Sequence, residues 1–512
     1  MPGVPASSTG RPDTTPRVRV DFVGHATLLV RIGTLTILTD PWWSGPAFRG
    51  QWYPYPLPVP ERFDLSGLDA VYISHAHEDH LHRETLAELL RVAPDVMAVI
   101  PKRYDTAMRD YLRRIGFRRI REVPSGTHVD VRNGQHSASL RVYTHMDDSM
   151  LSIESGGQVL LNANDALHAS RRDLIEEYCR VLRRRLPRID YLFCGFGGAS
   201  YFPNCIHVPD KDDGIVARDR EVFFLRNFAL VTERLQPRYA FPFAAHFVLP
   251  DERNWWISDS RLRMAPPAET VRQLASDLRS QVHDLQPGDW VEDGVVHATP
   301  YPRIEPSLAR GEVLARYGSA SEPKALSAAQ FDQLVDAART RAAERALGLS
   351  ADERLDAVVR LWDYAAAGIS IRVADRSADI AQTTTQPSTE PEVVFATRSD
   401  LLSATMKSPF GRDLITIGYA ADVRLRSGRE MATNAHERLL NLLAFPQTRW
   451  RERLRKHPGR VLGFMVGDAS MRYELKTKLK SKLGRTRSTN ANANERELYA
   501  IADWADLART PE

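Results

Sequence analysis

The chain has 512 residues, 43% of them hydrophobic and 26% charged, which is ordinary for a globular protein of two or three domains. Its net charge of +4 comes from arginines scattered among carboxylates, so we expect no nucleic-acid partner. No run of about 18 apolar residues is present, which excludes a membrane-spanning helix. The three cysteines lack CxxC spacing, which argues against a disulfide framework and favours a reducing, cytoplasmic setting.

The first sixteen residues have no apolar core of a signal peptide, and we expect them to be a disordered lead-in. Residues 17–40 alternate apolar and polar side chains and break at two glycines, a pattern that predicts two or three antiparallel strands. Asp40 closes the last of these strands, where it would orient a ligand histidine, and His25 would do similar work. A turn-forming aspartate and a core histidine are the alternative interpretations.

Residues 49–65 are rich in proline and aromatic side chains, so they cannot form a regular helix or a central strand. We interpret them as a lid or wall over a site. Trp42 and Trp43, just before them, would contribute a dry apolar wall to the same site.

The segment VYISHAHEDHL, residues 71–81, carries the strongest chemical signal of the chain. A short apolar run leads into four potential metal ligands, which is typical of a buried strand that ends in a functional loop. Four such groups within six residues cannot all face one ion, so the spacing predicts two adjacent metals. His75 and His77 would bind one ion, and Asp79 with His80 would bind the other.

Three more potential ligands each follow a predicted strand farther along the chain. His145 would complete the first metal site, Asp165 would bridge the two ions, and His246 would close the second site. Taken alone, His145 and Asp165 are more often surface polar residues, and His246 has a core histidine as its alternative.

A strand at 191–194 opens into a glycine-rich loop that matches neither phosphate-loop pattern. Aromatic and polar side chains follow the loop and are good candidates for a pocket with one apolar wall and a few polar contacts: Tyr201, Phe202, Asn204 and His207.

The last third of the chain predicts a helical extension at 301–378, with helices over 325–347 and 351–366. A polar linker or exposed loop at 379–392 would lead to a small α+β module at 393–512, which weakly resembles lipid-carrier modules. The basic run 473–487 is either a solvated helix end or a dock, for an acidic redox partner or for the phosphates of a CoA- or nucleotide-linked substrate.

Several segments together resemble a known family. GHAT, LTDPWWSGPAF, ISHAHEDHL, FGGASYFP and LQPRYAFPFAAHFV are similar to the catalytic domain of CMP-N-acetylneuraminate hydroxylases and to diiron monooxygenases of bacterial natural-product pathways, including those for diterpenoids. This resemblance implies a role in a pathway such as antibiotic biosynthesis. The resemblance implies an α/β fold, the metallo-β-lactamase αββα sandwich, over residues 17–300. It also implies a first ion held by His75, His77 and His145, a second held by Asp79, His80 and His246, and Asp165 between them. Asp79, Asp165 and His246 would be the catalytic members.

The resemblance further implies a non-heme diiron monooxygenase that hydroxylates a small molecule with dioxygen and external electrons. The sialic-acid hydroxylases also carry a Rieske cluster, which needs a pair of motifs, CxH and CxxH. That pair is absent here, because no cysteine begins a CxxH motif, so the electrons would come from a separate ferredoxin or reductase. Two alternatives stay open: a dinuclear zinc or manganese hydrolase of an ester, lactone or phosphodiester, and a non-catalytic metal-binding scaffold.

Overall fold

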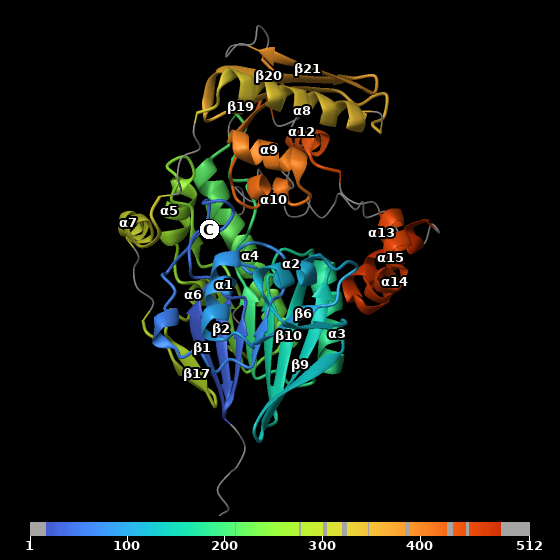
Figure 1. Cartoon of the computed structure of the whole chain (residues 1–512). Helices are drawn as coiled ribbons and strands as arrows, with labels where there is room; N and C mark the ends of the chain where they lie inside the picture. The colour runs from blue at the N-terminus through green and yellow to red at the C-terminus, as the bar shows by residue number, and fades with distance from the viewer. Residues whose placement is uncertain are drawn as a thin grey trace, which may run out of the picture.

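The computed structural model describes residues 17–482, except for 210, 276–277, 301–304, 320–324, 347, 384–389, 428–433 and 447–449. The predicted disordered lead-in, residues 1–16, lies outside the described residues. Figure 1 shows a layered sandwich at the base of the molecule, a smaller sheet-and-helix unit above it, and a group of short helices at one side.

Two sheets form the centre of the sandwich. The first has the strand order β18-β17-β1-β2-β3-β5-β6-β7, with bounds Val295–His297, Trp290–Glu292, Val18–Gly24, Thr27–Ile32, Leu35–Thr39, Ala70–Tyr72, Met97–Pro101 and Arg119–Val123. The second has the order β16-β14-β12-β11-β10-β9-β8, with bounds Gln281–Val282, Tyr239–Phe243, Tyr191–Gly195, Gln158–Asn164, Asp148–Ser155, His136–His145 and His128–Asn133.

Helices cover the outer face of each sheet. On the first sheet lie α1 (Arg83–Val92) and α2 (Ala107–Ile115), and on the second lie α3 (Arg172–Arg185), α4 (Asp213–Leu235) and α6 (Pro267–Leu274). Buried side chains of both sheets meet in one core between them, among them Val20, Leu140 and Phe241. This is the αββα arrangement expected from the sequence, because each sheet hides one face on its partner and one under helices.

Short elements connect the sandwich to the rest of the chain. They are β4 (Tyr53–Pro54), which pairs with β15 (Phe247–Val248), the 3₁₀ turn η1 (Pro60–Arg62), α5 (Trp255–Leu262) and α7 (Pro306–Tyr317). The proline-rich stretch 49–65 therefore has almost no regular structure, as its composition predicts.

The C-terminal unit is built on a third sheet with the order β13-β23-β22-β19-β20-β21. Its strands span Ile206–His207, Asp422–Leu425, Val393–Thr397, Leu355–Leu361, Tyr364–Ala374 and Ser377–Thr383. Four helices belong to the same unit: α8 (Ala328–Ala346), α9 (Ser399–Lys407), α10 (Gly411–Thr416) and α12 (Ala435–Leu443).

This unit corrects three predictions. The helix expected over 351–366 is wrong, because β19 and the start of β20 occupy that range. The linker expected at 379–392 begins inside β21, and residues 384–389 lie outside the described part. A boundary at 392 would also cut one sheet, since β19 pairs with β22 in parallel. The helix was predicted because the spacing of Leu355, Val358, Val359 and Trp362 fits one face of a helix. The β-branched residues among them are stabilised more by packing in a strand that is paired on both sides.

The last three helices are α13 (Trp450–Lys456), α14 (Pro458–Gly467) and α15 (Ala469–Lys482). Figure 1 shows them apart from the third sheet, against the α3 side of the sandwich. Among the described residues, no helix has the length and apolar character needed to cross a bilayer.

Candidate metal centre

The HxHxDH loop follows the short strand β5, which is fully buried between the parallel strands β3 and β6. Parallel strands present their carboxyl ends at one edge of a sheet, and that edge is where the loop lies. His75, Asp79 and His80 are buried, and His77 is more exposed. The motif is therefore held in the interior by strand pairing, with one histidine toward the outside.

His75, His77 and Asp148 form the first half of the site. His75 Nε2 lies 2.8 Å from His77 Nδ1 and 3.7 Å from Asp148 Oδ1. The potential ligand atoms of the three residues all lie within 4.8 Å of one another. Asp148, the first residue of β10, was not identified from the sequence, although it stands opposite His145 in the β9–β10 hairpin.

His25, Asp79 and His80 form the second half. Asp79 Oδ2 lies 3.1 Å from His25 Nε2 and 3.2 Å from His80 Nε2. Asp165 Oδ2 lies 3.3 Å from His80 Nε2, and Asp165 also forms a group with His75 and His80. Asp165 thus lies between the two halves, where the sequence placed it.

The donor set fits divalent cations. Two ligand atoms about 2.1 Å from one ion at right angles are about 3 Å apart, which matches the spacings of 2.8, 3.1 and 3.2 Å. Asp165 Oδ1 is buried without a hydrogen-bond partner among the described residues, and His80 Nε2 is buried between two carboxylate oxygens at 3.2 and 3.3 Å. Buried polar atoms such as Asp165 Oδ1 normally have a partner, and a cation would supply one.

Proton equilibria in the cluster follow from burial and mutual charge. Burial disfavours the His80 imidazolium, but the carboxylates of Asp79 and Asp165 outweigh it and raise the pKa of His80 well above its usual value. Burial and the charge of His80 lower the pKa of His75 well below its usual value. Burial also raises the pKa of Asp148 to about 7. A dication would favour the ionised carboxylates and neutral imidazoles that bind metal best.

Asp40 and Asn164 hold the motif from behind. Asp40 Oδ1 accepts hydrogen bonds from the Ser74 amide at 2.8 Å and the Ser74 hydroxyl at 3.0 Å, and Asp40 Oδ2 lies 3.6 Å from His80 Nδ1. Asn164 Nδ2 donates to Asp40 Oδ2 at 2.8 Å. Asp40 therefore has the orienting position expected from the sequence, whereas Asn164 was missed, since an asparagine at a strand end carries no distinctive pattern.

Three non-glycine residues at this edge have left-handed backbones: His25 (φ 47°), Asp40 (φ 38°) and Asn164 (φ 49°). Each lies at or just past the end of a strand, and each side chain contacts the cluster. Such conformations are costly and concentrate at functional sites. The backbone strain therefore supports the same location as the side-chain chemistry.

The structure places two expected ligands outside these groups. His145 binds hydroxyls through both ring nitrogens, Ser470 Oγ at 2.5 Å and Ser170 Oγ at 2.8 Å. His246 packs between Phe22 and Phe196, and its carbonyl oxygen lies 3.3 Å from His25 Nδ1. Asp148 and His25 occupy the corresponding places beside the motif. Of the three distant ligands, only Asp165 joins the cluster, and the complete ligand assignment stays a prediction.

Of the five expected pocket residues, the structure places one beside the metal centre and four away from it. Trp42 is buried with its ring 4.8 Å from that of His25, so it forms an apolar wall beside the second half of the site. The other four lie where the sandwich meets the C-terminal unit. Tyr201 donates to Glu437 at 3.2 Å, Phe202 stacks on His436, and His207 pairs with Asp213 at 3.0 Å. Asn204 is buried with no side-chain partner among the described residues.

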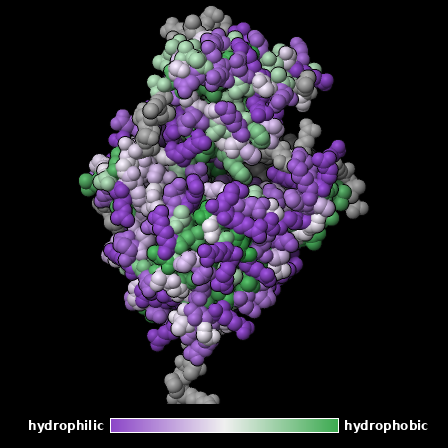
Figure 2. Space-filling view, viewed as in Figure 1, coloured by the Kyte–Doolittle hydropathy of each residue, from purple (hydrophilic) through white to green (hydrophobic). Residues whose placement is uncertain are grey.

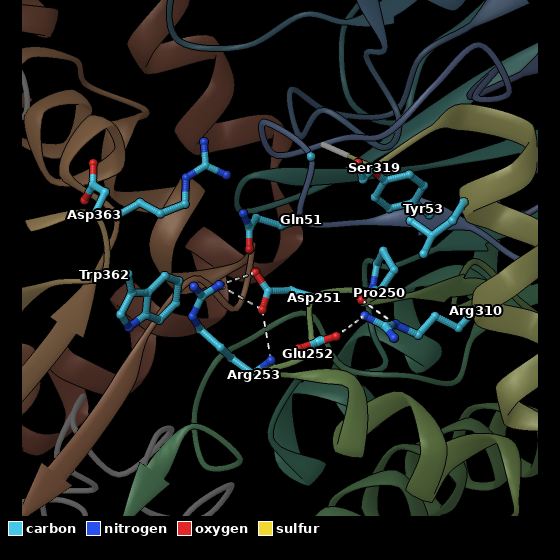
Figure 3. A pocket seen from close by; sticks show the side chains of 13 residues that line it. Gln51, Tyr53, Pro250, Asp251, Glu252, Arg253, Arg310, Ser319, Trp362 and Asp363 are labelled. Atoms are coloured by element: carbon cyan, nitrogen blue, oxygen red, sulfur yellow. Dashed lines mark hydrogen bonds and ion pairs between the residues drawn. The ribbon is translucent and has the colours of Figure 1, made fainter. Parts of the chain in front are cut away.

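A separate cavity of about 520 Å³ opens between the sandwich, α7 and the C-terminal sheet (Figure 3). Arg253 pairs with Asp251 at 2.9 Å and lies over the Trp362 ring, while Arg310 pairs with Glu252 at 3.4 Å. None of the expected site residues lines this cavity, and Figure 3 shows Arg253 and Arg310 engaged with the neighbouring carboxylates. It is therefore distinct from the metal centre.

Comparisons with known proteins agree with the fold. Residues 36–154 match the family model described as a beta-lactamase superfamily domain. Cytidine monophosphate-N-acetylneuraminic acid hydroxylase from Danio rerio is 28% identical over 258 residues, covering 49% of this chain and 42% of that protein. The enzyme of the same name from Mus musculus is 28% identical over 265 residues, with 49% and 42% covered.

A putative Rieske 2Fe-2S iron-sulfur protein of Mycobacterium tuberculosis is 26% identical over 220 residues, covering 40% of this chain and 39% of that protein. Among solved structures, CmlA, a diiron beta-hydroxylase from Streptomyces venezuelae, is 18% identical, with 56% of this chain and 55% of that chain covered and a TM-score of 0.36. The chain spans about two fifths of the length of the curated relatives it matches. The expected metallo-β-lactamase fold is confirmed.

Proposed function

Since residues 36–154 form a beta-lactamase superfamily domain with a histidine and carboxylate cluster at its edge, we propose that this chain is a non-heme diiron monooxygenase. One observation carries the proposal: each half of the cluster has two histidines and one carboxylate, His75 and His77 with Asp148, and His25 and His80 with Asp79. Two histidines and a carboxylate around one ion are the ligand set of many iron oxygenases. The hydroxylases among the curated relatives support the same chemistry.

In the proposed reaction one oxygen atom of dioxygen enters a C–H bond of the substrate and the other leaves as water. Two electrons and two protons from outside the chain balance the reaction. Bound iron would supply the redox chemistry. The chain would bind the ions through the two triads, orient His80 and Ser74 through Asp40, and exclude water on one side with Trp42.

The C-terminal unit contributes to the surroundings of the site. Burial raises the pKa of Asp413 on α10, and the charge of His77 opposes this shift, which supports a position of α10 near this half-buried histidine of the motif. A small-molecule substrate, including a CoA- or nucleotide-linked one, is our prediction for this side. A reducing, cytoplasmic setting likewise stays a prediction, in keeping with three buried free thiols.

The test compares two metals in the same protein. Metal-free chain reconstituted anaerobically with Fe(II) should consume dioxygen when a chemical reductant is supplied, and the Asp148→Asn variant should lose most of this activity. A dinuclear hydrolase would instead turn over esters, lactones or phosphodiesters with Zn(II) or Mn(II) and without dioxygen. Hydrolysis of that kind, together with no oxygen uptake by the iron form, would refute the monooxygenase.

A further inference from the structure

The three-helix segment α13–α15 exposes an unusual amount of apolar surface. The described chain has ten exposed large hydrophobic side chains, and five of them lie on these helices: Leu454, Leu462, Val466, Leu475 and Leu479. Leu462 and Val466 are four residues apart on α14, as are Leu475 and Leu479 on α15, so each pair lies on one face of its helix. Clustered exposed hydrophobics on a folded protein mark a surface that another molecule covers.

The helices that carry these apolar side chains also carry exposed positive charges without ion-pair partners. Five exposed cations form no ion pair with any carboxylate in the described ranges: Arg451, Arg455, Arg472, Lys476 and Lys478. The acidic side chains on the same helices are already engaged or hidden, because Glu452 pairs with Lys456, Glu474 pairs with Arg171, and Asp468 is buried. Figure 2 shows apolar side chains among hydrophilic ones at the right-hand edge, where Figure 1 places these helices.

The opposite side of the same helices is fixed to the sandwich next to the metal centre. Asp468 Oδ2 accepts the Met146 amide at 3.1 Å, and Ser470 Oγ lies 2.5 Å from His145 Nδ1. His145 and Met146 belong to the β9–β10 hairpin that carries Asp148. Farther out, Arg460 binds Glu122 and Tyr473 donates to Asp173 at 2.9 Å. A molecule seated on the outer face of α13–α15 would thus be separated from the candidate iron site by one layer of helices and one hairpin.

We propose that the outer face of α13–α15 docks an acidic one-electron carrier, such as a [2Fe-2S] ferredoxin, that reduces the metal centre. The inference rests on the proposed monooxygenase, which needs two external electrons per turnover. Exposed apolar side chains with exposed cations on the same helices suit a transient electron-transfer complex, in which charge complementarity sets the orientation and the association rate. The direct contact between α15 and the hairpin of Asp148 favours an electron carrier over a membrane surface. Electron transfer requires a short distance to the metal centre, whereas membrane binding does not.

The experiment measures binding and electron delivery separately. The probe is an acidic plant-type [2Fe-2S] ferredoxin with its reductase, and the variant is Lys476→Glu combined with Lys478→Glu. The matched control reverses two exposed cations elsewhere, Arg132→Glu on β8 and Arg376→Glu in the β20–β21 turn. Calorimetry gives the affinity of each iron-loaded protein for the ferredoxin, and oxygen uptake is recorded with the ferredoxin system and with a chemical reductant.

We expect the Lys476/Lys478 variant to lose at least tenfold in affinity and in ferredoxin-driven oxygen uptake, to keep its rate with the chemical reductant, and to show binding that weakens with salt. The control should stay within twofold of the unmodified chain. Equal affinity in the variant and the control would overturn the proposal. So would charge-dependent binding to vesicles containing phosphatidylserine without ferredoxin binding, or a dimer in sedimentation that the variant abolishes. Charge-dependent ferredoxin binding without oxygen uptake under any reductant would support the dock and refute the monooxygenase.

Discussion

Replacing Asp148 by asparagine should have opposite effects on the metal-free and the metal-loaded protein. Burial raises the pKa of the Asp148 carboxyl from 3.8 to about 7, so the folded metal-free protein holds a proton that the unfolded chain releases. At about 1.4 kcal/mol per pKa unit, the ionised carboxylate costs the folded state at most about 4 kcal/mol above pH 7. Because 25% of the side chain is exposed, solvent screens part of this cost, and we expect about 2 to 4 kcal/mol.

The sign follows from proton linkage. The folded state binds the extra proton, so stability falls as the pH rises from about 4 to about 7 and then levels off. Asp148→Asn removes this loss. In the chelator-treated protein, the variant should therefore be more stable than the unmodified chain at pH 8, by about 2 to 4 kcal/mol, and equally stable below pH 4.

In the metal-loaded protein the order of stability should reverse, so that the unmodified chain is more stable than Asp148→Asn. The neutral amide that Asp148→Asn introduces is a poorer ligand than a carboxylate, so the first half of the cluster should lose its ion and the bound stoichiometry should fall from two to one. His145→Asn is the matched control, because His145 binds Ser470 and Ser170 and lies outside the ligand groups. Urea denaturation and elemental analysis give the two readouts. A less stable metal-free Asp148→Asn protein, or loss of an ion only in His145→Asn, would refute the reasoning.

Three further outcomes follow from the structure. Removal of metal by a chelator should lower the midpoint of thermal unfolding, measured by scanning calorimetry. Each ion restored at 100 times its Kd should add about 2.7 kcal/mol to the free energy of unfolding. An unchanged midpoint would contradict a metal site. Burial lowers the pKa of His436 to about 3, so its neutral form is needed for folding and stability should fall as the pH drops below about 6.5. Between pH 7 and 5 this loss is about 2 kcal/mol, and His436→Gln should lack it in urea denaturation at both pH values. Trp52→Ala removes a ring stacked 3.6 Å from that of Phe247 and should cost about 3 to 5 kcal/mol, whereas a loss below 1 kcal/mol would show that this contact does not stabilise the fold.

The sequence by itself determined the features that depend on residues close together along the chain. Six consecutive positions, HAHEDH, place four ligands after a buried strand, and strand pairing can present them only at the carboxyl edge of the sheet. The role of Asp40 was also predictable, because Asp40 follows β3, and β3 pairs in parallel with β5, the strand that leads into the motif. Helix α8 and strand β22 likewise agree with their local patterns.

Only the tertiary structure decided which distant side chains complete the cluster. His145 and Asp148 face each other across one tight hairpin, and no local pattern tells which of the two the turn directs toward His75. His25 joins the second half because a left-handed backbone after β1 aims its ring at Asp79, a conformation that the sequence does not display. The strand β19 also depends on distant partners, since β20 and β22 supply its hydrogen bonds. Local chemistry fixes which groups are available, whereas packing over long sequence separations fixes which of them meet.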